Sequence, residues 1–105
     1  MQFSALKHRV TVQQNQPTIN AFGEETEQWV TIATVWASVE PLKGREFFAA
    51  QKENAETTVR ITIRYRMGIT ADMRIKFGNK VFEINAVIDV EERHIELQIM
   101  CMELV

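Results

Sequence analysis

The chain has 105 residues, of which 46% are hydrophobic and 25% are charged, with a net charge of −2 and one cysteine. This length suits one domain over residues 1–105, and one cysteine excludes an internal disulfide or a thiolate cluster that could hold zinc. No run approaches the roughly 18 apolar residues of a membrane span, and the N-terminus lacks a signal-peptide pattern, so we expect a cytosolic protein without a membrane partner.

A first strand is predicted over residues 7–13, where apolar and polar side chains alternate. Residues 14–28 have no apolar period and contain Pro17, Asn20 and Gly23. We predict a long exposed connection there, or a loosely paired hairpin, because long loops of compact domains are usually functional or mobile.

A second strand is predicted over residues 29–40. Its alternation slips near Ala33 and Thr34, which indicates a bulge or a strand buried on both faces. Pro41 lacks a backbone donor and should end the strand.

Residues 41–56 form the one segment with a helical pattern, and a helix of about three turns must pack against something to persist. Two interpretations remain open. The helix could plug one end of a barrel through Phe47 and Phe48, or the segment could change conformation on assembly.

The clearest strand pattern lies in residues 57–67, where Val59 to Tyr65 place an apolar side chain at every second position. The opposite face is basic, with Arg60, Arg64 and Arg66. The pattern predicts a half-buried strand with one core face and one charged face.

Three further strands follow the same alternation, over residues 72–77, 80–89 and 95–102. Gly78 and Asn79 are typical of a two-residue hairpin turn, and residues 91–94 form a polar turn. The sequence therefore predicts a mainly β protein, a small six-stranded and mostly antiparallel barrel or sandwich with one short α-helix.

The charge is unevenly distributed along the second half of the chain. Residues 60–80 carry six basic side chains and one acidic one, and residues 81–105 carry six acidic side chains and one basic one. Opposite charges on neighbouring strands can pair across a sheet, whereas a basic stripe could meet nucleic acid phosphate. Overall acidity makes free nucleic acid binding the weaker interpretation.

Residues that carry chemistry are sparse. The sequence has no nucleophile elbow, no phosphate-binding glycine loop and no metal-ligand spacing, and its two histidines are far apart in sequence. Cys101 continues the period-two apolar pattern of its strand and is predicted to be a buried core thiol. We expect neither catalysis nor a cofactor nor a bound metal.

Several segments resemble the head–tail connector proteins of tailed bacteriophages and prophages, also called head-closure or head–tail joining proteins. The matching segments, in order along nearly the whole chain, are residues 6–13, Trp29 with 35–41, 44–51, 61–66, 68–70, 73–74, and Cys101 with Glu103. Ala71 stands where a proline is common in that family.

The resemblance implies a compact β-barrel that assembles as a ring, typically dodecameric, below the portal and its adaptor. Such a ring extends the DNA exit channel, retains the packaged DNA, which passes without sequence-specific binding, and offers a docking surface to a tail-completion or tail-terminator protein. The resemblance thus implies a structural virion protein at the head–tail interface that assembles in the host cytoplasm.

In some relatives the long connection between the second and third strands folds into the channel as a stopper. The residues that the resemblance places in this channel or stopper segment are Lys43, Arg45, Glu46, Phe47, Phe48, Gln51, Lys52 and Glu53. The residues that it places in a loop contacting a neighbouring ring component are Asn20, Phe22, Glu24, Glu25 and Glu27.

A ring needs a head-to-tail interface, and oppositely charged flanks on one subunit would suit it. The charged residues predicted to lie between subunits are Arg60, Arg64, Arg66, Arg74, Lys76, Glu91, Glu92 and Glu96. The alternative is a small nucleic-acid-binding barrel that uses the face of Arg60, Arg64 and Arg66. A small-ligand barrel or enzyme is a third and weaker possibility, since it needs an apolar pocket with convergent polar groups.

Overall fold

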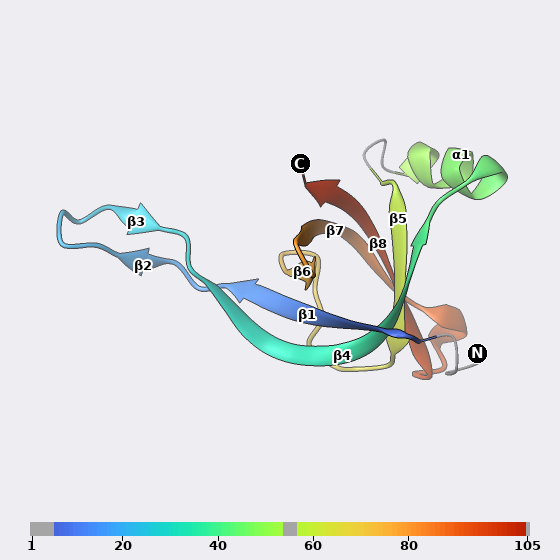
Figure 1. The fold of residues 1–105 in the computed structure, drawn as a ribbon, viewed down its shortest axis with the longest axis horizontal. Coiled ribbons are helices and arrows are strands. Elements are labelled where there is room, and N and C mark those ends of the chain that lie inside the picture. Colours follow the sequence, from blue (N-terminus) through green and yellow to red (C-terminus); the bar gives the residue numbers. More distant parts are fainter. Residues whose placement is uncertain (1–5, 54–56, 105) are drawn as a thin grey trace.

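The computed structural model describes residues 6–53 and 57–104. Six antiparallel strands close into a barrel in the order β1-β4-β5-β8-β7-β6 (Figure 1). Their bounds are β1 His8–Asn15, β4 Trp29–Pro41, β5 Val59–Arg64, β6 Arg74–Phe77, β7 Lys80–Asp89 and β8 Glu96–Leu104. The mainly β class, the six strands and the single helix are as predicted, and the pairing of β6 with β1 closes the sheet.

The core lies inside this barrel and is built by the alternation seen in the sequence. Ile61 and Ile63 on β5 are fully buried, while Arg64 on the same strand is exposed. Completely burying one such side chain contributes roughly 1.5–3 kcal/mol. Other side chains with less than 2% exposure are Phe82, Ile75, Ile99, Val10, Val12, Cys101 and the small Ala37. Burial raises the pKa of the Cys101 thiol to about 12, so the predicted core thiol is confirmed.

The slip in the pattern of β4 is a β-bulge. Val12 pairs with Ala33 and the next residue, Gln13, pairs with Thr31, so Ile32 is the extra residue. A bulge bends its strand and increases the local twist. In Figure 1, β4 curves strongly and connects a long projection to the rest of the barrel. Pro41 is the last residue of β4, as predicted.

One turn and one further bulge set the register of the hairpin strands. Phe77 pairs with Lys80 across Gly78, whose φ of 59° suits the first central position of a primed turn. In β7 a second bulge leaves Asn85 outside the ladder, and its Oδ1 accepts a hydrogen bond from Thr57 Oγ1 at 2.9 Å.

The helix α1 spans Gly44–Glu53 and does not plug the barrel. Phe48 is 69% exposed and Phe47 is half-buried, and neither belongs to the core cluster. Consecutive residues on a helix point about 100° apart, so the two rings cannot both face the barrel. Leu42, just before the helix, is buried instead. Residues 54–56, the end of the predicted helical segment, lie outside the described residues.

The two charge blocks do not form separate flanks of the barrel. The acidic strands β7 and β8 lie between the basic strands β5 and β6 in the barrel order. Arg64 therefore pairs in register with Glu96, and Arg74 with Glu83. The expectation of two opposite flanks was wrong, because hairpin connectivity interleaves the blocks. Within the described residues, no helix has the length and apolar character needed to cross a bilayer.

Candidate interaction surfaces

The first candidate surface is a β-hairpin arm formed by residues 16–28. Its strands β2, Thr18–Ile19, and β3, Glu25–Thr26, continue from the ends of β1 and β4 and project away from the barrel (Figure 1). The amide of Gln16 donates to the carbonyl of Gln28 at 2.7 Å, which joins the arm to the barrel ladder. Of the two alternatives for this stretch, the structure shows the hairpin.

The tip of the arm is ordered by one side chain. Asn20 Oδ1 accepts hydrogen bonds from the amides of Phe22 at 2.9 Å and Glu24 at 3.0 Å. Gly23 completes the turn with a φ of 80°, a conformation that glycine adopts without strain. The turn presents Phe22 at 88% exposure, beside Ile19 at 74%. Large apolar side chains on a monomer surface are typical of contact sites when they gather with charged neighbours.

The predicted loop residues all lie on this arm and are exposed. Besides Asn20 and Phe22 they are Glu24, Glu25 and Glu27. The arm carries three carboxylates and no basic residue between positions 16 and 28.

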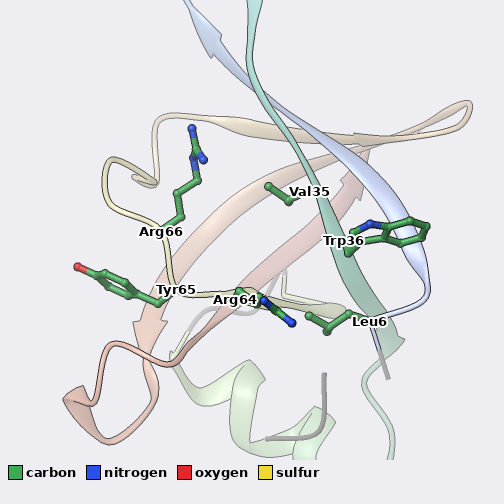
Figure 2. A pocket seen from close by; sticks show the side chains of 6 residues that line it. All are labelled: Leu6, Val35, Trp36, Arg64, Tyr65 and Arg66. Carbon is green, nitrogen blue, oxygen red and sulfur yellow. The ribbon is translucent and has the colours of Figure 1, made fainter. Parts of the chain in front are cut away.

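The second candidate surface is an open groove of about 590 Å³ on the wall of the barrel (Figure 2). It is lined by Leu6, Val35, Trp36, Arg64, Tyr65 and Arg66. Trp36 is 52% exposed because its neighbour Ala37 occupies the core position, so the indole faces outward. The guanidinium of Arg9 lies 5.0 Å from the centre of the Trp36 ring, within cation–π range.

Sequence reasoning singled out Arg64 and Arg66 but not the other side chains of the groove. The signal that was missed is Trp36, because the alternation along its strand places this large aromatic side chain on the outward face. Leu6 precedes the predicted first strand, and only the closed barrel brings it to the same groove as Arg64.

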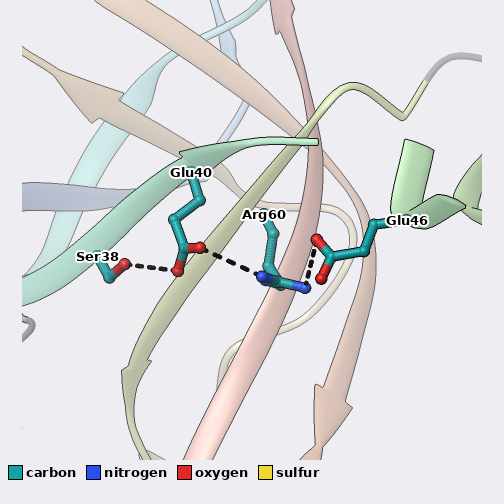
Figure 3. A network of polar contacts seen from close by, with 4 residues as sticks. All are labelled: Ser38, Glu40, Glu46 and Arg60. Atoms are coloured by element: carbon teal, nitrogen blue, oxygen red, sulfur yellow. Dashed lines mark hydrogen bonds and ion pairs between the residues drawn. The ribbon is translucent and has the colours of Figure 1, made fainter. Parts of the chain in front are cut away.

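A third surface lies around α1, where one cation links the helix to two strands (Figure 3). Arg60 contacts Glu40 Oε2 at 3.2 Å and Glu46 Oε2 at 3.3 Å. Ser38 Oγ donates to Glu40 Oε1 at 2.9 Å. The side-chain amide of Gln51 also donates to the carbonyl of Thr57. The helix is thus fastened by polar contacts, and exposed ion pairs of this kind contribute little each.

The other described residues of the predicted stopper segment lie mostly on the surface. Lys43, Arg45, Phe48 and Lys52 are exposed, and Phe47 packs edge-on against Phe48 with ring centres 5.7 Å apart. Glu53 is the last residue of α1.

The charged residues predicted to lie between subunits are dispersed. Arg60 is held by the helix network, whereas Arg64 and Arg66 line the groove. Arg74 lies at the base of the arm, where its Nε donates to Gln13 Oε1 at 2.8 Å and its guanidinium lies 4.2 Å from the Trp29 ring centre. Lys76 is exposed on β6 and Glu96 is half-buried on β8.

Glu91 and Glu92 lie in a turn that borders the groove residue Tyr65. Both have positive φ, 55° and 56°, in the short 3₁₀ segment Val90–Glu92. Asp89 organises this turn by accepting the His94 amide at 3.0 Å and contacting His94 Nδ1 at 2.5 Å. The His94 ring lies 4.5 Å from that of Tyr65. Sequence reasoning found no partner for His94, because a bond across five residues depends on the turn.

No group of three or more His, Cys, Asp or Glu side chains suited to a metal ion occurs in the described part of the chain. The described residues form a closed barrel with an exposed arm, a groove and a helix tethered by polar contacts.

Comparisons with known proteins identify the family. The family model described as phage head completion protein matches residues 1–104. A Shigella flexneri 2a protein of known solution structure is 34% identical, with a TM-score of 0.79 and coverage of 98% of this chain and 96% of that one. A chain in the virion of a native gene transfer agent particle has the same fold, with 18% identity, a TM-score of 0.63 and coverage of 95% and 96%.

A search of curated protein sequences found no match. The family match spans almost the whole length, and the relative at 34% identity covers nearly all of both chains. The chain therefore belongs to the phage head completion protein family, as the sequence resemblance indicated, and is a structural protein of the phage head.

Proposed function

We propose that the protein joins copies of itself into a ring at the head–tail interface, where the ring extends the DNA channel below the portal and its adaptor and offers a docking surface to the tail. The observation that carries this proposal is the arm. A closed barrel has no free sheet edge for association, so contacts must come from surface features. The arm is such a feature, with Phe22 at 88% exposure at its tip.

The shape supports an assembly in which subunits reach beyond their own barrel. The described residues extend 48 Å in one direction and 27 Å in the other two. An arm at one end of the long axis fits a head-to-tail arrangement, in which one surface of a subunit meets a different surface of the next and the set closes into a ring.

The helix α1 is the segment that we propose to line or close the channel. It rests on the barrel through Arg60, Glu46 and Gln51 and places no side chain in the core cluster. Releasing it would break a few polar contacts without opening the core. Elements of low local stability are those that move in switching transitions.

Partners in this proposal are the portal or adaptor, a tail-completion or tail-terminator protein, and DNA that slides through without sequence-specific contacts. The net charge of −2 suits such sliding, because the 14 acidic side chains outnumber the 12 basic ones and oppose retention of phosphate.

Electron microscopy of the protein mixed with its purified portal–adaptor complex tests the proposal. We expect added ring density directly below the adaptor, and stoichiometric co-sedimentation with the complex. The portal complex alone is the reference. A mixture whose images match the reference at saturating protein would overturn the proposal.

A further inference from the structure

The arm and the groove have complementary chemistry. The arm carries Glu24, Glu25 and Glu27 without a basic residue, and it exposes the apolar side chains of Ile19 and Phe22. The groove is lined by two arginines and by three side chains with apolar surface, Leu6, Val35 and Trp36. Figure 2 shows Arg64 beside Leu6, and Val35 between Arg66 and Trp36. An apolar contact flanked by opposite charges is the usual anatomy of a specific protein interface.

The arm cannot fill the groove of its own chain. It leaves the barrel at Trp29, whereas Trp36 lies seven residues further along β4, about 23 Å at the rise of an extended strand. Figure 1 shows the arm pointing away from the barrel, at the opposite end of β1 from the side where that strand begins. Leu6 lies two residues before the start of β1. An occupant with this chemistry must therefore come from another molecule.

The arm is also prepared for insertion. Its turn is closed by the two bonds to Asn20 Oδ1, and the hydroxyls of Thr18 and Thr26 lie 3.1 Å apart across the hairpin. A segment that is ordered before binding loses less conformational entropy when it docks. Phe22 is thus presented as an aromatic anchor, the residue type that contributes most at interface centres.

We infer that the hairpin arm of one copy inserts into the groove of the next copy. In this contact Phe22 packs against Trp36, and the arm carboxylates lie beside Arg64 and Arg66. This inference rests on the proposed ring and names its contact. Arm against arm would place like charges together, so the contact runs from one subunit to the next in a single direction.

Cysteine crosslinking tests the contact directly. Ala21→Cys and Thr34→Cys variants, which carry tags of different size and leave both aromatic rings of the contact intact, are mixed and oxidised. Both positions are exposed, whereas Cys101 is fully buried and serves as an internal spectator. We expect heterodimer yield at least fivefold above that of a control pair of Ala21→Cys with Ala86→Cys. Ala86 is exposed on β7, opposite β4 in the barrel order. Equal yields for the two pairs would overturn the inference.

A charge swap supplies a second readout. The pair Glu24→Lys and Glu25→Lys reverses the charge of the arm. The pair Arg64→Glu and Arg66→Glu reverses the charge of the groove. In the crosslinking pairs, either reversal alone should lower the yield at least fivefold, and the two together should restore it. Arg66→Glu alone serves if the double groove variant does not fold by circular dichroism. Yields that ignore both reversals contradict the inference.

DNA is the competing occupant of a surface with two arginines. If a short DNA duplex shields the cysteine of Thr34→Cys from alkylation at low salt, and an excess of unmodified protein does not, the groove binds DNA and the inference is wrong. If ring density below the adaptor persists in both charge-reversed variants, this contact is wrong and the proposed function still holds. If the unmodified protein adds no such density, the proposed function is wrong. The crosslinking yields then still test whether the arm and the groove bind each other.

Discussion

The barrel wall and its two appendages are stabilised in different ways. In the wall, every strand pairs on both sides and Ile61, Ile63 and Phe82 are almost completely buried. The arm and α1 bury no side chain in the core cluster and are held by backbone ladders, one asparagine and a few ion pairs. The comparison shows that stability resides in the wall, whereas the arm and α1 can be altered while the wall stays intact.

The appendages also differ from each other. The arm is a continuation of β1 and β4 and is closed by hydrogen bonds to Asn20, so it is a rigid projection. The helix is attached through side chains such as Gln51 and Glu46, which can exchange partners with water. We therefore assign presentation of a contact to the arm and movement to the helix.

The largest expected effect concerns thiol reactivity in the wall. Burial raises the pKa of Cys101 from 9.0 to about 12, so the thiolate fraction below pH 9 falls roughly 1,000-fold relative to the unfolded chain. A thiol reagent at pH 8 should label Cys101 only in denaturant, as mass spectrometry would show. Because unfolding releases this proton above pH 9, the contribution to stability is complete below pH 9 and is lost as the pH rises toward 12. Rapid labelling of the folded protein would contradict the buried wall.

Truncation of aromatic side chains distinguishes the barrel wall from the arm and the helix. Phe82→Ala should lower the free energy of unfolding by about 3–5 kcal/mol, because Phe82 is 1% exposed and the change leaves a cavity. Phe48→Ala and Phe22→Ala should each change it by less than about 1 kcal/mol, since both rings are exposed. Urea denaturation measures all three. A large loss for Phe48→Ala would restore the idea that the helix plugs the barrel.

The order of the arm depends on Asn20. Asn20→Ala removes the acceptor of two amide bonds, each with a net contribution of about 0.5–1.5 kcal/mol. Amide exchange at Phe22 and Glu24 should accelerate about tenfold in hydrogen-exchange mass spectrometry or NMR. Amides of Val10 and Val12 in the wall provide the internal control. Unchanged exchange at the tip would show that the turn is ordered by its backbone alone.

The smallest effect is expected at the helix tether. Arg60→Met keeps the aliphatic stem and removes two ion pairs with Glu40 and Glu46, each worth about 0.2–1 kcal/mol at an exposed site. Exchange at α1 amides such as that of Phe47 should rise a few-fold while the global free energy of unfolding changes by less than about 1 kcal/mol. High salt should produce part of the same change in the unmodified protein. Equal protection in both proteins would show that the tether lies elsewhere.

Several features were predictable because they depend on neighbours in sequence. Alternation located the strands, Gly78 and Asn79 located a hairpin, and the slip in β4 located a bulge within two residues. The apolar period of the last strand predicted burial of Cys101. The family resemblance assigned the arm residues to a contact loop, a role that remains a prediction.

Other features depended on which strands become neighbours. The groove joins Leu6, Trp36 and Tyr65, residues from three separate segments, and no local pattern could bring them together. The same holds for Arg60, which the alternation placed on a basic face and which the fold pairs with Glu40 and Glu46.

By itself, the amino-acid sequence determined the strands, their buried faces and the family, because side-chain periodicity and turn residues act over a few positions. Only the tertiary structure decided that the acidic strands lie between the basic ones, that Phe48 faces solvent, and that a groove with two arginines exists at the far end from an acidic arm. The physical reason is barrel closure: strand order is set by long-range pairing, and that order decides which charges and apolar side chains meet.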